Sequence, residues 1–248
     1  MKIATWNVNG IRARQTQFCD WLERDRPDVV CLQELKAQPE QIPQQCHHMD
    51  YHVYWHGSLR AYSGVSLHIR KGLFETEPVF SHPEFDMESR IVQAAVGSLV
   101  IASVYVPNGG KDYGAKIQFM TRLAAWTEQL HREGRELVLC GDINITRADN
   151  DVHPKERKPD VIGQREEERM LFDKLLGGHL VDVGRALDPD NANMFTWWAP
   201  WRSMRQRNIG WRIDYILASP TISARATACP VLADVGTSDH APVMMTTA

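Results

Sequence analysis

The segment Glu136-Leu137-Val138-Leu139-Cys140-Gly141-Asp142-Ile143-Asn144 carries the strongest evidence in this chain for a buried sheet. Its four consecutive apolar residues end at a glycine, which is typical of a short strand buried on both faces. Asp142 and Asn144 follow, and side chains two residues apart lie on the same face of an extended chain. Loops after the strands of a rigid sheet often carry chemistry, so this pair is a candidate site. A plain β-turn is the alternative, because Gly, Asp and Asn all favour turns.

The composition is typical of a globular protein. The chain has 248 residues, of which 43% are hydrophobic and 24% charged, and this length allows one large domain or two small ones. No run approaches the roughly 18 apolar residues of a membrane span, and the N-terminus enters a strand at once without the form of a signal peptide. The five cysteines are scattered, without the spacing of a metal site. Free thiols in a reducing compartment are expected, and hence a cytoplasmic protein.

Apolar periodicity predicts strands that alternate with a few helices. The predicted strands are 2–7, 28–33, 51–56, 64–70, 73–79, 90–96, 98–106, 136–141, 194–198, 211–218, 222–229 and 242–247. The predicted helices are 12–25, a short one at 39–48, 114–132 and 167–176, and residues 149–164 are expected to form a long surface loop. No low-complexity linker divides the chain. We therefore expect a single domain over residues 1–248, with two packed sheets and helices outside them.

Polar side chains gather at the ends of the predicted strands. They are Asn7, Asn9, Glu34, Tyr105, Asn108, Asp142, Asn144, Asp214, Asp239 and His240. Asp214 stands among alternating strand residues, where an unpaired charge would be costly, so it requires a partner. His240 is the expected partner, because an aspartate that orients an imidazole is a recurrent arrangement.

This inventory favours one kind of chemistry. Oxygen ligands without thiolates suit Mg²⁺ or Mn²⁺ rather than structural zinc. Hydrolysis of a phosphate ester requires stabilised charge at the phosphate, a positioned water and help for the leaving oxygen. Histidine, asparagine and tyrosine can donate hydrogen bonds to phosphate, and Asp142 can take a proton from water. The set fits a metal-dependent phosphodiesterase better than acyl transfer or redox chemistry.

The net charge of −3 does not indicate a nucleic-acid partner, but the segment 201–212 does. It contains four arginines and no acid, and four of the eight tryptophans lie between 197 and 211. Cations interleaved with aromatic rings suit a phosphate backbone and unstacked bases. A solvated basic face is the alternative for the arginines, and ordinary core packing is the alternative for Trp197, Trp198 and Trp201.

Six motifs together resemble those of the exonuclease III family of abasic-site (AP) endonucleases, over nearly the whole chain and in order. They are Thr5-Trp6-Asn7-Val8-Asn9-Gly10-Ile11-Arg12-Ala13, Leu32-Gln33-Glu34-Leu35-Lys36, Tyr105-Val106-Pro107-Asn108-Gly109, Gly141-Asp142-Ile143-Asn144, Trp211-Arg212-Ile213-Asp214-Tyr215 and Ser238-Asp239-His240-Ala241-Pro242. The resemblance implies the fold of the wider endonuclease/exonuclease/phosphatase superfamily. That fold is α/β, a four-layered α/β sandwich of DNase I type with two packed mixed β-sheets flanked by helices.

The resemblance also implies roles for the catalytic and metal-binding residues. Glu34 is similar to the main metal ligand, helped by Asn9 or Asn7, and Asp239 binds a second metal or assists the leaving group. Asp142 is similar to the residue that activates the attacking water, and Asn144 holds it. His240, oriented by Asp214, would donate to the scissile phosphate, and Tyr105 resembles a tyrosine near it.

A second set of positions is similar to the DNA-binding residues of that family. Trp197, Trp201 and Trp211 match positions that form a pocket for an extruded, base-free sugar, which has no stacking to lose. Further candidates for DNA contacts are Arg90, Asn108, Lys111 and Arg205. The sequence departs from some relatives at two places: Asn9 replaces an aspartate, and Lys111 replaces an arginine, so phosphate would be bound there without bidentate geometry. No motif covers 149–165.

The resemblance therefore implies a Mg²⁺-dependent DNA-repair nuclease. It would cut on the 5′ side of an abasic site in duplex DNA and leave a 3′-hydroxyl, with 3′→5′ exonuclease or 3′-phosphatase activity besides. We expect double-stranded DNA with abasic sites or 3′ ends as partner, no membrane, a monomer, and an intracellular, nucleoid-associated location. Two alternatives stay open: a phosphodiesterase for a small phosphorylated ligand, and a DNA-binding module without catalysis.

Overall fold

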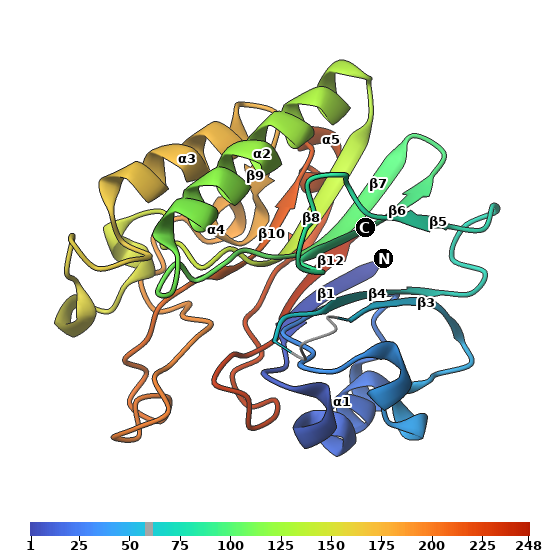
Figure 1. Cartoon of the computed structure of the whole chain (residues 1–248), viewed down its shortest axis with the longest axis horizontal. Helices are drawn as coiled ribbons and strands as arrows, with labels where there is room; N and C mark the ends of the chain where they lie inside the picture. The colour runs from blue at the N-terminus through green and yellow to red at the C-terminus, as the bar shows by residue number, and fades with distance from the viewer. Residues whose placement is uncertain (58–61) are drawn as a thin grey trace.

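The computed structural model describes residues 1–57 and 62–248, in which two six-stranded sheets pack face to face (Figure 1). The first sheet has the order β11 (Ala226–Ala228), β12 (Val243–Thr247), β1 (Lys2–Asn7), β2 (Val29–Gln33), β4 (Val65–Arg70) and β3 (Tyr51–His56). The second has the order β5 (Val79–Ser81), β6 (Ile91–Val96), β7 (Leu99–Tyr105), β8 (Glu136–Asp142), β10 (Asp214–Ala218) and β9 (Val181–Asp182). The pairs β1–β2 and β7–β8 are parallel and the other pairs are antiparallel, so both sheets are mixed.

Helices cover the outer face of each sheet. Helix α1 (Ile11–Asp25) packs against the first sheet, and α2 (Tyr113–Arg132) with α3 (Glu166–Leu176) packs against the second (Figure 1). The shorter helical elements are η1 (Pro39–Gln41), η2 (Gln44–Cys46), η3 (Asp149–Asp151), η4 (Pro154–Glu156), α4 (Val183–Leu187) and α5 (Pro220–Ser223). The predicted four-layered α/β sandwich is confirmed.

Strand β8 shows why the layers form. Val138 and Cys140 belong to the core between the two sheets, and Leu137 and Leu139 to the core beneath α2 and α3. Alternate side chains point to opposite faces of a strand, so an unbroken apolar run buries both faces. The prediction of a doubly buried strand is confirmed, and the strand continues through Gly141 to Asp142 rather than ending at the glycine.

Gly141 is required by a close approach between parallel strands. It pairs with Val104 of β7, and a Cβ added at position 141 would lie 1.9 Å from the carbonyl oxygen of Val104. No side chain can occupy that space. The glycine therefore lets β7 and β8 run side by side up to their last residues, Tyr105 and Asp142.

Three predicted elements outside residues 194–218 were wrong in part. Residues 39–48 form two single 3₁₀ turns, η1 and η2, because Pro43 separates them. Residues 73–79 contain no strand before Val79, since the chain turns where the Leu73 amide donates to Arg70 and then reaches Pro78. Residues 222–229 divide into α5 and β11.

The segments 194–198 and 211–213 are not strands but a pair of bridged loops. Trp197 forms isolated bridges with Trp211 and His240, and β10 begins only at Asp214. The amide of Arg212 donates to the Asp151 carbonyl, and the amides of Ile213 and Asp214 both donate to Thr196 Oγ1. Since these donors are used by loop partners, no ladder forms before Asp214.

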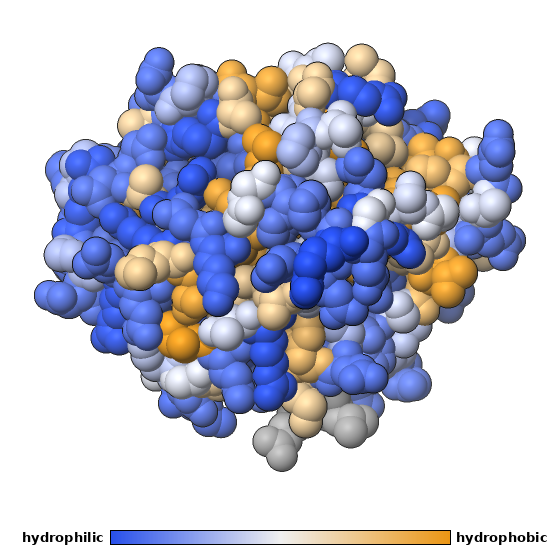
Figure 2. Space-filling view, turned by 90° about the horizontal axis from the view of Figure 1, so that it is seen from above, coloured by the Kyte–Doolittle hydropathy of each residue, from blue (hydrophilic) through white to orange (hydrophobic). Residues whose placement is uncertain are grey.

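The outer surface is polar on the face that is seen when the molecule of Figure 1 is viewed from above. Figure 2 shows hydrophilic residues over most of this face, with the apolar side chains scattered among them. In the part of the chain that the structure describes, no helix is long and apolar enough to cross a membrane.

Candidate active site

Strand register brings three predicted site residues into one row. Tyr105 ends β7, Asp142 ends β8 and Asp214 begins β10, and both neighbours are Cα partners of Asp142. Asn7 ends β1 in the other sheet, and its Nδ2 donates to Asp142 Oδ2 over 2.9 Å. The two sheets therefore meet at this carboxylate.

Asp142 is buried and held by three donors. Besides Asn7, the Asn144 backbone amide donates to Oδ1 over 2.8 Å, and Asn144 Nδ2 donates to Oδ2 over 3.1 Å. Asn144 has a left-handed backbone with φ of 54°, which returns its amide to the carboxylate two residues earlier. Burial raises the pKa of Asp142 to about 7; Asp214 adds to this, whereas His240 and the amide donors oppose it. Near neutral pH this group can accept or release a proton.

His240 lies between two carboxylates. Its Nδ1 is 2.9 Å from Asp214 Oδ2, and its Nε2 is 3.9 Å from Asp142 Oδ2. Burial lowers the pKa of His240, but the carboxylates of Asp214, Asp142 and Asp239 outweigh burial and raise it to about 10. The imidazole is therefore charged at neutral pH and oriented by Asp214, the pair expected from the sequence.

Asp239 joins this centre to the N-terminal strand. Its Oδ1 accepts a hydrogen bond of 2.7 Å from Asn9 Nδ2, and its Oδ2 accepts one of 3.0 Å from Trp197 Nε1. Burial raises its pKa, but charged His240 and these two donors outweigh burial and lower it. Asp239 therefore stays ionised beside the imidazole.

The side-chain ammonium of Lys36 lies among the oxygens of Glu34 and Asn9. Lys36 Nζ is 2.9 Å from Glu34 Oε1 and 2.5 Å from Asn9 Oδ1. All three residues have left-handed backbones, with φ of 55° at Glu34, 45° at Asn9 and 50° at Lys36, a conformation that concentrates at functional sites. The oxygens thus converge on positive charge. Lys36 lies within one of the family motifs, but the sequence predicted no role for it.

The ligand atoms of Asp142, Asp214 and His240 also lie within 4.8 Å of one another. This cluster could bind a metal ion, although it is not the set of Glu34, Asn7, Asn9 and Asp239 that the sequence predicted as metal ligands. Of the two groups, the oxygens around Lys36 are the better cation site, because the charged imidazole of His240 has no lone pair to give a metal ion.

Arg90 and Tyr105 form a second polar pair, at one end of the row of Tyr105, Asp142 and Asp214. The Arg90 guanidinium lies 5.0 Å above the centre of the Tyr105 ring, and its Nε contacts Glu88 Oε2 at 2.7 Å. Arg90 Nη1 is buried without a hydrogen-bond partner among the described residues. Burial, with the charges of Glu34 and Asp142, raises the pKa of Tyr105 well above its usual range, so its hydroxyl stays a donor.

Trp197 and Trp211 form a wall beside the imidazole. Their rings pack edge to face with centres 5.5 Å apart, and the Trp197 ring lies 6.5 Å from that of His240. Both are half-buried, whereas Trp198 is a core residue. The structure therefore brings two of the three predicted pocket tryptophans to the site, and leaves the third, Trp201, 60% exposed on a separate loop.

The remaining candidates for DNA contacts differ in their surroundings. Asn108 and Lys111 are exposed, and Asn108 Oδ1 accepts from the Gly110 amide. The Arg205 guanidinium stacks on Trp198 at 4.9 Å and donates to the carbonyls of Ala233, Ser238 and Val235. Arg205 thus holds the loop that leads to His240, and a contact to DNA from it remains a prediction.

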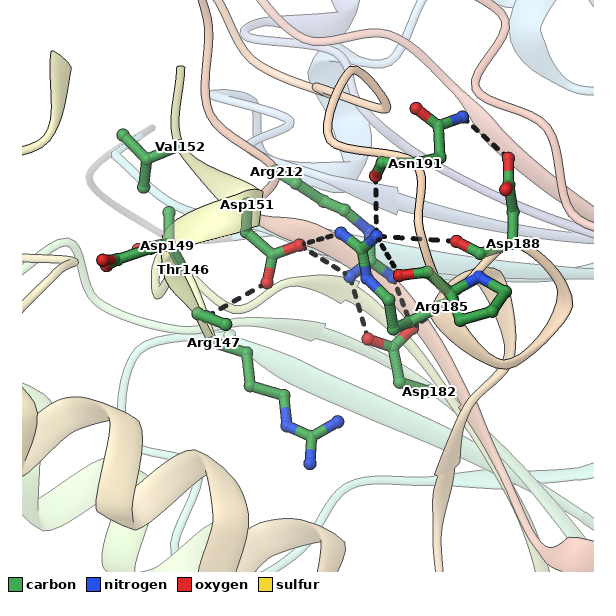
Figure 3. A network of polar contacts seen from close by, with 12 residues as sticks. Thr146, Arg147, Asp149, Asp151, Val152, Asp182, Arg185, Asp188, Asn191 and Arg212 are labelled. Carbon is green, nitrogen blue, oxygen red and sulfur yellow. Dashed lines mark hydrogen bonds and ion pairs between the residues drawn. The ribbon is translucent and has the colours of Figure 1, made fainter. Parts of the chain in front are cut away.

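A buried ion network fixes the chain next to Trp211 (Figure 3). Arg212 Nη1 lies 3.2 Å from Asp151 Oδ1 and 2.8 Å from Asp182 Oδ2, and its Nη2 also pairs with Asp182. Arg185 Nη2 reaches Asp151 Oδ1 at 2.6 Å (Figure 3). The network joins η3, at the start of the expected long loop, to β9 and to the segment before β10, so it sets the backbone that carries Trp211.

Lys116 is a further residue that sequence reasoning missed. Its side chain and that of Glu168 are fully buried, 2.5 Å apart, and its Nζ donates to the carbonyl of Asn144 over 2.8 Å and to that of Asn108 over 3.3 Å. Burial lowers the pKa of Lys116, and Glu168 opposes this. Its position in the sequence could have identified it, because Lys116 lies on the apolar side of α2, one turn before Phe119.

Two packed mixed sheets, with carboxylates, amides and a charged imidazole at their strand ends, define a hydrolase of phosphate esters. The chain matches the Endonuclease/Exonuclease/phosphatase family over residues 4–240, and it belongs to this family. It is 32% identical over 251 residues to an exodeoxyribonuclease of Bacillus subtilis (strain 168), with 98% of each chain covered.

Solved structures are similar over the whole chain. An AP endonuclease from Archaeoglobus fulgidus has a TM-score of 0.89 at 29% identity and covers 100% of this chain and 99% of its own. The 3′ phosphatase NExo from Neisseria, bound to a product DNA hairpin, has a TM-score of 0.88 at 32% identity with the same coverage. The predicted family and the predicted enzyme class, a hydrolytic nuclease of DNA repair, are confirmed.

Proposed function

We propose that this chain is a Mg²⁺- or Mn²⁺-dependent phosphodiesterase that cuts duplex DNA on the 5′ side of abasic sites and leaves a 3′-hydroxyl. One observation carries the proposal: charged His240 lies between Asp214 and Asp142 and beside the Trp197 ring, and its neighbour Asp239 is bonded to Asn9, which also contacts Lys36. Similarity to an AP endonuclease and to a 3′ phosphatase supports this substrate class and a 3′-phosphatase or 3′→5′ exonuclease activity besides.

In this proposal Asp142 receives the proton of the attacking water. Its pKa of about 7 suits that role, and the hydrogen bonds from Asn7 and Asn144 fix its orientation. Charged His240 donates a hydrogen bond from Nε2 to a phosphate oxygen, while Asp214 holds the ring by Nδ1, and the leaving 3′ oxygen takes its proton from water. The Tyr105 hydroxyl and Arg90 Nη1, which has no hydrogen-bond partner among the described residues, supply further donors to the same phosphate.

Glu34 and Asn9 would hold the divalent ion, with Asn7 and Asp239 as neighbouring oxygen donors. The fit rests on Lys36, because its ammonium shows that these oxygens already accept a cation. A set of oxygen donors without sulfur suits Mg²⁺ or Mn²⁺. When bound, the ion would neutralise charge that develops on the phosphate.

The proposed DNA contacts come from tryptophans, an asparagine and a lysine around the candidate active site. We assign Trp197 and Trp211 to the base-free sugar, because their rings lie beside the imidazole and an abasic nucleotide has no stacking to lose when it is extruded. Exposed Trp201 would stack on a flanking base, and Asn108 and Lys111 would contact phosphates. Since both sheets supply site residues, we further propose that residues 1–248 act as one domain.

The test compares cleavage of three labelled duplexes that carry an abasic analogue, a nick and a 3′-phosphate, with Mg²⁺ and with EDTA. The expected result is cutting 5′ to the abasic analogue that stops in EDTA, with a 3′ end that a polymerase extends. An unchanged rate in EDTA would remove the metal from the mechanism. Hydrolysis of a small phosphate ester without DNA cleavage would favour the small-ligand phosphodiesterase instead.

A further inference from the structure

A second group of metal-ligating side chains lies where the edge strands of the two sheets meet. His56 ends β3, the edge of the first sheet, and His82 follows β5, the edge of the second. Asp86 lies in the connection between β5 and β6. Tyr54 of β3 and Phe80 of β5 stack beside them, with ring centres 5.9 Å apart, so an aromatic platform fixes the two edges relative to each other.

The three side chains converge closely enough for one ion. His56 Nε2 is 2.6 Å from Asp86 Oδ2, and the rings of His56 and His82 stack with centres 4.6 Å apart and planes 14° apart. One ligand atom from each residue lies within 4.8 Å of the others. His82 is exposed and His56 half-buried, so an ion can enter from solvent.

Asp86 is prepared for such a role. Its side chain has no exposed area, and its Oδ1 accepts hydrogen bonds from the backbone amide of Arg90 at 2.9 Å and from that of Glu88 at 3.4 Å. These bonds hold the carboxylate and leave Oδ2 directed to His56. A supported ligand of this kind is what outer-shell hydrogen bonds give a metal centre.

We infer that His56, His82 and Asp86 form a binding site for a transition-metal ion of the Zn²⁺ or Co²⁺ type. Two imidazoles and one carboxylate match the three protein ligands of an open zinc site, in which water takes the fourth position. The donor set also differs from the oxygen-only group of Glu34 and Asn9, which suits Mg²⁺ or Mn²⁺. The two sites therefore prefer different ions.

A metal ion here would act on Arg90. The turn from Asp86 to Arg90 is closed by the bond from the Arg90 amide to Asp86, and the Arg90 side chain lies over Tyr105 in the candidate active site. An ion that fixes Asp86 would fix the base of this turn and hence the position of the guanidinium. The inference of binding does not depend on this effect or on the proposed nuclease mechanism.

The chain supplies a matched control. His131 and His179 also stack, with ring centres 5.1 Å apart and planes 17° apart, but this pair belongs to no group of three metal ligands among the described residues. The variants to compare are therefore His82→Ala, which removes an exposed ligand, and His131→Gln, which disturbs a stack without the carboxylate. Glu34→Gln removes a ligand of the proposed Mg²⁺ site, so it shows whether an ion binds there instead.

The experiment titrates EDTA-stripped protein with Co²⁺, followed by visible absorption, and with Zn²⁺, followed by calorimetry. One equivalent should give the intense absorption of a four-coordinate Co²⁺ site in the unmodified chain, in His131→Gln and in Glu34→Gln. His82→Ala should weaken Zn²⁺ binding by more than about 100-fold, beyond the roughly 10–100-fold of losing a supporting hydrogen bond. Unfolding without metal should not change, because His82 is exposed.

Two results would contradict the inference that His56, His82 and Asp86 bind a metal ion. Titrations of His82→Ala that match those of the unmodified chain would show that this histidine is not a ligand. Loss of the absorption in Glu34→Gln but not in His82→Ala would place the ion in the candidate active site instead. Neither readout requires nuclease activity, so failure of this site and failure of the proposed function are separate results.

Discussion

Replacement of Asp214 by Asn should remove the charge that keeps His240 protonated while preserving the shape of the pair. The amide oxygen of the introduced asparagine would still accept from His240 Nδ1, now 2.9 Å from Asp214 Oδ2, and the backbone bond to Thr196 would be unaffected. Since the Asp214 side chain is fully buried, solvent does not screen its charge. The change is therefore one of electrostatics rather than of packing.

The magnitude follows from the imidazole's surroundings. His240 has a pKa of about 10 although burial lowers it, because three carboxylates raise it, with Asp214 the closest. Loss of one opposite charge at contact distance should lower this pKa by about 1–3 pH units, or about 1.4–4 kcal/mol. A pKa raised above the unfolded value of about 6.5 stabilises the fold below pH 6.5, and this stabilisation is lost as the pH rises to about 10. In the variant it should be lost about 1–3 pH units earlier.

The assay is a titration of the imidazole ring nitrogens by NMR in EDTA, with the His240 signal assigned from His240→Gln. Asp190→Asn, at an exposed aspartate, is the matched control and should leave the midpoint unchanged. The alkaline limb of the activity profile should move with the NMR midpoint. An imidazole that titrates at the same pH in Asp214→Asn as in the unmodified chain would refute the reasoning.

Three further predictions concern stability and DNA binding. Burial lowers the pKa of His68 to about 3, so unfolding free energy should fall by about 1.4 kcal/mol per pH unit below about 6.5, and chemical denaturation of His68→Phe should lack this contribution. Arg212→Met should cost about 3–5 kcal/mol by the same assay and the half-buried Arg147→Met under about 1 kcal/mol, and equal costs would contradict the role of the network in Figure 3. Trp201→Ala should weaken DNA binding by about 1–3 kcal/mol without a change in melting temperature, and unchanged binding would exclude stacking.

Much of the fold could be predicted because the chain encodes it locally. In β8 the unbroken apolar run Leu137 to Cys140 specified a strand with two buried faces, whereas the close approach at Gly141 was visible only in the structure. The predictions failed where distant hydrogen bonds replace the ladder. Residues 211–213 have strand-like composition, yet the amides of Arg212 and Ile213 donate to Asp151 and Thr196, partners that no local pattern reveals.

The candidate site shows the same division. Residues at strand ends were found because polar groups after buried strands are visible in sequence, and Asp142, Asp214 and His240 do converge. Lys36 was not assigned, because its contacts with Glu34 and Asn9 depend on left-handed backbone at all three residues. Arg205 was assigned by composition to DNA, but its donors reach carbonyls about thirty residues along the chain, as only the folded loop shows.

The measurement that most directly tests the account is single-turnover cleavage of an abasic duplex in Mg²⁺ by the unmodified chain and by Asp142→Asn, with DNA affinity measured in parallel. Asparagine keeps the size of the side chain between Asn7 and Asn144 but cannot take a proton. We predict a loss of at least about 10²–10⁴-fold in the cleavage rate with nearly unchanged affinity. Cleavage by Asp142→Asn at the rate of the unmodified chain would contradict the central claim.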